Sequence, residues 1–122
     1  MRTLNKNIGN FGEDLAEIYL KKAGYKLIER NFRCKIGELD IIGKDDKYIA
    51  FIEVKTRYSN SYGSPCEAVT TSKQFKIYKT AQYYIMLKKL YKLNFRFDVV
   101  EVILNNIDSN HNIRLIKNAF QI

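Results

Sequence analysis

The pattern of apolar and polar residues along the chain predicts helices and strands in the order α-β-β-β-α-β-β. Helical spacing is expected within residues 11–24 and from about residue 72 to 92. Strand patterns occupy residues 25–33, 36–43, 47–57, 95–104 and 113–120. This order predicts an α/β fold, a single domain over residues 1–122 in which a mixed β-sheet is flanked by helices.

The first expected helix lies in the stretch GEDLAEIYLKKAGY. Its apolar stripe runs from Ile18 round to Leu20, and Gly24 is expected to end the helix. Glu13 lies about 20° from Leu20 in helical projection, whereas the other two acids of this helix fall further into its polar side. Glu13 is therefore the acid expected to lean over the sheet. An equally natural alternative is that Glu13 is present only because the helix dipole favours an acid near the N-terminus.

The stretch IGELDIIGKDDKYIAFIEVKTR contains two of the expected strands, residues 36–43 and 47–57. Both carry charged residues at positions where buried strands normally carry none. Residues two apart in a strand share a face, so Glu53 and Lys55 point the same way. A two-residue turn at residues 46–47 pairs residues whose numbers sum to 93 and thus places Asp40 opposite Glu53. Their Cβ atoms would be about 4.5 to 5.5 Å apart. A shift of one residue would turn Asp40 to the other face.

Two opposed carboxylates repel each other unless a positive charge lies between them. Lys55 is expected to supply part of that charge and a divalent cation the rest, because Mg²⁺ prefers carboxylate, carbonyl and water oxygens. The alternative is a structural network of ion pairs, since E-x-K on a strand is often a surface ion pair. Against that, the strand YIAFIEV looks covered on both faces, where charges need partners.

Charge composition adds a second indication. Lys and Arg total 21 against 13 Asp and Glu, which gives a net charge of +8. Residues 68–97 contain no acid and seven basic residues: Lys73, Lys76, Lys79, Lys88, Lys89, Lys92 and Arg96. Such a stretch attracts polyanions, most commonly nucleic acid, although a solvated helix surface weighs about equally on this feature alone. The first three of these lysines and Arg57 are the expected DNA contacts.

Other chemistries are disfavoured by composition. Cys34 and Cys66 lack C-x-x-C spacing and are expected to be reduced thiols. The chain has one histidine, His111, which argues against a His/Cys zinc site and against histidine-based catalysis. No apolar run could span a bilayer and the first residues contain no apolar signal segment, so a cytoplasmic protein without membrane binding is expected. A homodimer is left open.

Five separated blocks carry a resemblance to a known family. In chain order they are GEDLAEIYLKKAGY, RNFRCKIGELDII, FIEVKTR, YGSPCEAV and FRFDVVEV. Together they resemble the YraN family of small bacterial proteins over essentially the whole chain. GELDIIG followed by FIEVKTR is also similar to the D…(D/E)-x-K signature of the restriction-endonuclease-like superfamily. The plan resembles that of archaeal Holliday-junction resolvases, with a helix glutamate ahead of that signature.

The resemblance implies a restriction-endonuclease-like fold and a Mg²⁺-dependent endonuclease acting on DNA, with Mn²⁺ as a substitute and branched DNA left open as the substrate. It implies that Asp40 and Glu53, with the carbonyl of Val54, hold the metal. Lys55 would orient or help to deprotonate the attacking water, and Glu13 would complete the metal shell or serve a second ion. The alternative is a DNA-binding module that retains the fold without catalysis.

Overall fold

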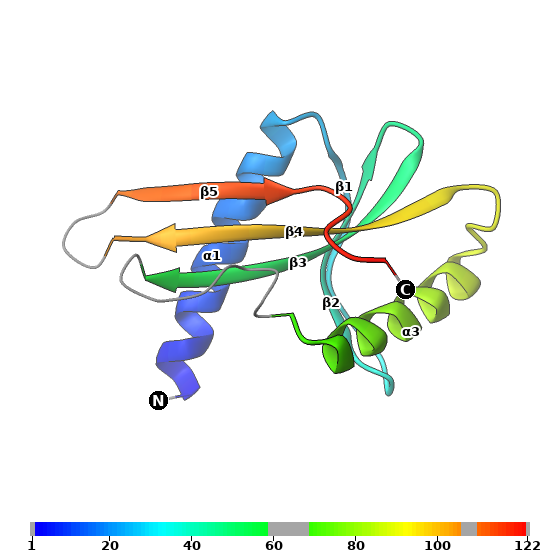
Figure 1. The fold of residues 1–122 in the computed structure, drawn as a ribbon, viewed down its shortest axis with the longest axis horizontal. Coiled ribbons are helices and arrows are strands. Elements are labelled where there is room, and N and C mark those ends of the chain that lie inside the picture. The colour runs from blue at the N-terminus through cyan, green and yellow to red at the C-terminus, as the bar shows by residue number, and fades with distance from the viewer. Residues whose placement is uncertain (1, 59–68, 106–109, 122) are drawn as a thin grey trace.

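The computed structural model describes residues 2–58, 69–105 and 110–121, with side chains described from residue 10 onward (Figure 1). The elements are α1 (Arg2–Lys22), β1 (Lys26–Arg33), β2 (Glu38–Asp45), β3 (Tyr48–Tyr58), α3 (Thr71–Lys88), β4 (Asn94–Leu104) and β5 (His111–Ile116). One sheet joins the strands in the order β1-β2-β3-β4-β5, with β3 and β4 parallel and the other neighbours antiparallel. The predicted mixed sheet flanked by helices is confirmed, and it is consistent with the restriction-endonuclease-like plan.

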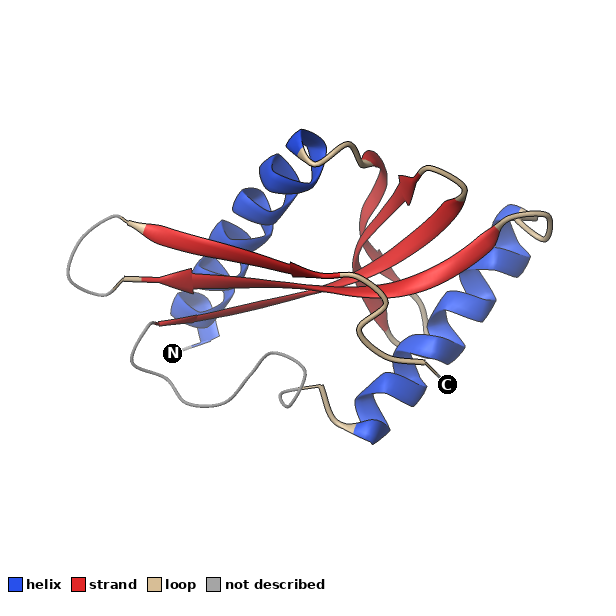
Figure 2. Cartoon of the chain, turned by 45° about the horizontal axis from the view of Figure 1, so that its top comes forward, coloured by secondary structure: helices blue, strands red, loops and turns tan. Residues whose placement is uncertain are grey.

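The two helices cover opposite faces of the sheet (Figure 2). The buried cluster on the α1 face consists of Ala16, Leu20, Tyr25, Ile41, Ala50, Ile52, Val100, Val102 and Leu104. The cluster on the α3 face consists of Phe32, Leu39, Ile42, Ile49, Phe51, Val69, Ile77, Ala81, Tyr84, Phe97 and Val99. Because successive residues of β3 alternate between the two clusters, this strand is buried on both faces, as predicted.

The buried side of α1 differs from the predicted stripe. Ile18 is half exposed, whereas Ala16 and Leu20 are fully buried. The reason is a close approach of helix to sheet, since a Cβ added at Gly12 would lie 1.8 Å from Oγ1 of Thr56. Gly12 and Ala16 therefore face the sheet at this close approach, where a larger side chain at position 12 would not fit. The predicted end of the helix is confirmed by a glycine with φ 98° at position 24.

The hairpin of β2 and β3 has the predicted register. Asp45 pairs with Tyr48 across a two-residue turn, in which Asp46 has φ 56°. Ile41 pairs with Ile52, so paired residue numbers sum to 93 as expected. This register fixes which face of each strand the charged residues occupy.

Two elements end earlier than the sequence indicated. α3 stops at Lys88 because Lys89 adopts a left-handed conformation, φ 57°, and the N–H of Leu90 donates to the carbonyl of Ile85. β5 ends at Ile116, short of residue 120. Cys34 is a free thiol as expected, whereas Cys66 lies outside the described residues. Among the described helices, none is long and apolar enough to cross a membrane.

Candidate functional site

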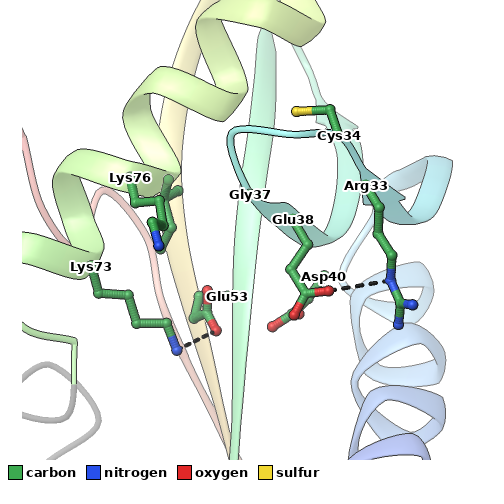
Figure 3. A pocket seen from close by; sticks show the side chains of 9 residues that line it. Arg33, Cys34, Gly37, Glu38, Asp40, Glu53, Lys73 and Lys76 are labelled. Carbon is green, nitrogen blue, oxygen red and sulfur yellow. Dashed lines mark ion pairs between the residues drawn. The ribbon is translucent and has the colours of Figure 1, made fainter.

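A cavity of about 400 Å³ opens where the start of β2, the middle of β3 and the first turns of α3 meet (Figure 3). Its lining residues are Arg33, Cys34, Gly37, Glu38, Asp40, Glu53, Lys73, Lys76 and Ile77. Four residues singled out in the sequence, two carboxylates and two lysines, therefore meet in one cavity. They come from the two strands of the β2–β3 hairpin and from α3, which follows later in the chain.

β2 changes its orientation at Asp40. Leu39 packs in the cluster under α3, whereas Ile41 packs in the cluster under α1, although residues two apart in a regular strand share a face. Asn31, which faces Asp40 across the β1–β2 pair, has φ 60°, an unusual value for a residue other than glycine. At this turning point, Oδ2 of Asp40 accepts a hydrogen bond of 2.9 Å from the N–H of Val54. The Asp40 carboxyl group is thereby fixed against β3.

The two predicted carboxylates interact directly. Burial and the neighbouring charge of Glu53 raise the pKa of Asp40 to about 7, and the Val54 N–H opposes this rise only in part. The repulsion expected from the sequence is therefore present, and near neutral pH a proton relieves it.

Two lysines act on the carboxyl groups. Lys73 Nζ lies 3.2 Å from Oε1 of Glu53 and forms the ion pair drawn in Figure 3. Lys55 lies beside Lys73, and its charge interacts with Glu53 and Asp40 as expected. Burial lowers the pKa of Lys55, and the charge of Lys73 lowers it further. A lysine from α3 thus holds Glu53, and the strand lysine lies beside it.

Glu13 lies near the site but is held by β1. Its side chain is 15% exposed against 62% for Asp14, which confirms that Glu13 leans towards the sheet. Its Oε1 lies 3.3 Å from Nε of Arg30, which also binds Asp14 and Glu17. Burial and the charge of Asp40 raise the pKa of Glu13. Within the described ranges, no three His, Cys, Asp or Glu side chains come close enough together to hold a metal ion.

The expected DNA contacts are only partly at the cavity. Lys76 lines it and is exposed. Lys79 lies outside the lining, with Nζ 5.0 Å from the centre of the Phe75 ring. Nε of Arg57 lies 2.5 Å from Oε2 of Glu101, a buried carboxylate on β4. Arg57 is thus held by an internal partner.

A second group of buried charges was not singled out in the sequence. Asp98, fully buried, accepts hydrogen bonds from Tyr25 Oη at 2.8 Å, Arg96 Nε at 2.8 Å and the Asn118 N–H at 2.9 Å. Arg96 also donates to Asp45 at 2.8 Å. Arg96 therefore belongs to an internal network and not to the exposed basic surface predicted for residues 68–97.

One signal could have identified these residues. Asp98 and Glu101 interrupt the apolar run FDVVEVIL, just as Asp40 and Glu53 interrupt their own strands. A carboxylate in such a strand needs a partner, and here the partners are Arg96 and Arg57. The pattern would have located the charges without distinguishing an internal ion pair from a site.

The donor set at Asp40 and Glu53 fits a hard divalent cation. Burial and the charge of Glu53 raise the pKa of Asp40 to about 7, and a cation between the two carboxyl groups would relieve their repulsion. In an extended strand, the N–H and C=O of one residue point to the same side. Because the Val54 N–H points at Asp40, its carbonyl lies on that side too. Oxygen ligands of this kind suit Mg²⁺ or Mn²⁺.

Comparison with known proteins gives a match along most of the chain. A family model described as "Uncharacterised protein family UPF0102" matches residues 12–102. The chain is 63% identical over 123 residues to a "UPF0102 protein" of Clostridium botulinum (strain Loch Maree / Type A3). It is 58% identical over 122 residues to a "UPF0102 protein" of Clostridium kluyveri. Both alignments cover the whole of each chain.

Proposed function

The chain belongs to the uncharacterised protein family UPF0102, also called YraN, and we propose that it is a Mg²⁺-dependent endonuclease of the restriction-endonuclease-like superfamily that hydrolyses phosphodiester bonds in DNA. One observation carries this proposal. Asp40 and Glu53 form a buried carboxyl pair, with a raised Asp40 pKa, in a cavity that also contains lysines. A carboxyl group with a perturbed pKa in a cavity, beside other charged groups, is typical of active sites.

Each residue of the site has its own part in the proposed reaction. Asp40, Glu53 and the carbonyl oxygen of Val54 would hold Mg²⁺, or Mn²⁺ in its place. When bound, such a cation polarises the phosphodiester and stabilises the charge that builds up on its oxygens. Lys55 would orient the attacking water and accept its proton, which its lowered pKa favours. Glu13 would add negative potential from the α1 side, because its charge already acts on Asp40.

DNA would be held by the basic first half of α3. Lys76 lines the cavity and Lys79 is exposed one turn further along the helix. The net charge of +8 adds a general attraction for the phosphate backbone. The substrate proposed is DNA, with branched DNA left open on the similarity of plan to junction resolvases.

A second candidate is a DNA-binding module without catalysis. The observation that favours it is that two of the three acids assigned to the site already form ion pairs with basic side chains. Glu53 is paired with Lys73 and Glu13 with Arg30, which leaves Asp40 as the unpaired carboxyl of the three in the described part of the chain. These ion pairs would neutralise the acids equally well in a protein that never bound a metal.

Cleavage assays separate the two candidates. Purified protein is incubated with duplex, single-stranded, flap and four-way-junction DNA in Mg²⁺, in Mn²⁺ and in excess chelator. Cleavage is expected with either cation and not with chelator. Asp40→Asn and Glu53→Gln should each lower the rate by about a hundredfold or more, since the cation supplies several kcal/mol of stabilisation.

Glu38→Gln is the matched control. Glu38 lines the same cavity and carries the same charge, but it is exposed and pairs with Arg33 at 3.2 Å. Its variant should cleave like the wild type. DNA binding without cleavage of any of the four substrates would favour the non-catalytic module instead.

A further inference from the structure

Lys73 has an unusual position in α3. The helix is capped by Thr70, whose Oγ1 accepts a hydrogen bond of 3.2 Å from the N–H of Lys73. Lys73 is thus in the first turn, which contains no acidic residue. A cation is disfavoured at that end of a helix, because the macrodipole places partial positive charge there. Some other interaction must favour a lysine at this position.

That interaction is the ion pair with Glu53. Lys73 Nζ and Glu53 Oε1 are 3.2 Å apart, and the Glu53 side chain is only 11% exposed against 42% for Lys73. Glu53 is therefore a fixed, nearly buried charge on the sheet, and Lys73 reaches it from the solvent side. The ammonium group lies against one of the two carboxylates assigned to the metal (Figure 3).

We propose that Lys73 is an exchangeable counter-cation of Glu53, which a divalent cation displaces and which then binds a phosphate of the DNA. The inference rests on the proposed function and adds to it an order of events, in which metal binding precedes the phosphate contact of Lys73. Metal binding would free one lysine at the cavity, so metal and DNA would bind with positive coupling through that lysine. Until a metal binds, the ion pair would offset part of the repulsion between the two carboxyl groups.

Charge and flexibility both support the exchange. A divalent cation between Asp40 and Glu53 would repel an ammonium group held 3.2 Å from Glu53. Lys73 can move away without unfolding, because its side chain is partly exposed and joined to the helix by a flexible stem.

Lys76 provides a matched control. It lines the same cavity from the same helix, and within the described part of the chain it makes no ion pair. Removing either lysine changes the net charge equally. Only the loss of Lys73 removes a competitor for Glu53.

The first test is calorimetric titration of Mn²⁺ into metal-free wild type, Lys73→Gln and Lys76→Gln. Lys73→Gln should bind Mn²⁺ about fivefold or more tightly than the wild type, as expected when one competing charge beside the metal is removed. Lys76→Gln should stay within about twofold, because its charge is screened by solvent. Lys73→Arg keeps the charge and should bind Mn²⁺ like the wild type. This variant controls for a change in folding caused by substitution at position 73.

The second test measures coupling as the change in affinity for duplex DNA on adding Ca²⁺ to chelated protein. The wild type should bind more tightly with Ca²⁺, Lys73→Gln should lose that gain, and Lys76→Gln should weaken binding equally in both conditions. If the wild type binds Mn²⁺ but Lys73→Gln binds it no more tightly than Lys76→Gln, the inference is overturned and the nuclease proposal stands. If the wild type binds no divalent cation, both are overturned.

Discussion

Asp40 is a buried carboxyl group that faces a second carboxyl group and accepts a hydrogen bond from the N–H of Val54. Burial and Glu53 together raise its pKa to about 7. An unfolded chain would return this pKa to about 3.9. Between these two values the folded protein holds a proton that the unfolded protein has lost.

This difference predicts a pH-dependent stability. Because the folded state binds more protons from about pH 4 to 7, the contribution of Asp40 to the free energy of unfolding should fall as pH rises through that window. Asp40→Asn removes the titrating group. The metal-free variant should therefore match the wild type near pH 4 and exceed it by a few kcal/mol above pH 7, as measured by urea unfolding across pH.

Asp46→Asn serves as the control for this prediction. It removes the same charge from the exposed turn between β2 and β3, where asparagine also tolerates the positive φ. Its stability relative to the wild type should vary little with pH. A variant at Asp40 that is less stable than the wild type above pH 7 would mean that Asp40 belongs to a stabilising ion-pair network.

At the scale of elements, α3 serves two purposes. Ile77, Ala81 and Tyr84 are buried against the sheet. Exposed lysines lie towards both ends of the helix. The N-terminal half faces the cavity, and the C-terminal half lies away from it. The basic segment is thus one helix whose two ends differ in their distance from the proposed site.

Salt dependence should distinguish those ends. Lys76→Ala combined with Lys79→Ala should weaken duplex binding and reduce the slope of log K against log[salt] by about 0.9 for each phosphate that the variant no longer binds. Lys88→Ala combined with Lys89→Ala removes the same charge from the far end and should change the slope less. Binding isotherms over a series of salt concentrations measure both slopes. Equal slopes in the wild type and the Lys76→Ala, Lys79→Ala variant would mean that the N-terminal end of α3 is a solvated surface that does not bind DNA.

At the scale of the whole molecule, Asp98 joins segments that are far apart in the chain. Tyr25 lies between α1 and β1, Asp45 ends β2, Arg96 and Asp98 are on β4, and Asn118 follows β5. Tyr25, Arg96 and the Asn118 N–H donate to the buried Asp98 carboxylate, and Arg96 also donates to Asp45. The network lies outside the lining of the cavity and is therefore expected to support the fold.

Asp98→Ala should accordingly lower the free energy of unfolding by about 3 to 5 kcal/mol, because it leaves Arg96 partly buried without its main partner. Denaturant unfolding measures this loss, and calorimetry on the folded variant at low temperature should show unchanged Mn²⁺ affinity. Asp98→Asn keeps the shape and part of the hydrogen bonding and should lose less. If Asp98→Ala lowers the free energy of unfolding by less than about 1 kcal/mol, the network contributes no more than an ordinary surface ion pair.

Local interactions allowed much of this arrangement to be predicted from the sequence. The order of elements follows from hydrophobic period, and the hairpin register follows from a two-residue turn. Asp40 and Glu53 lie within that hairpin, so their proximity could be foreseen. Each of these inferences depends on residues within about one hairpin of each other, where spacing along the chain fixes spacing in the fold.

Tertiary structure alone decided which partner each charge takes. Nothing local indicates that Lys73 pairs with Glu53, that Arg30 holds Glu13 or that Arg57 is bound by Glu101. The buried side of α1 was likewise set by a close approach to β3, which small residues permit and hydrophobic period does not reveal. The sequence determined where the charges sit along their elements, and the packing of helices on the sheet determined which of them meet, because that depends on distances between elements far apart in the chain.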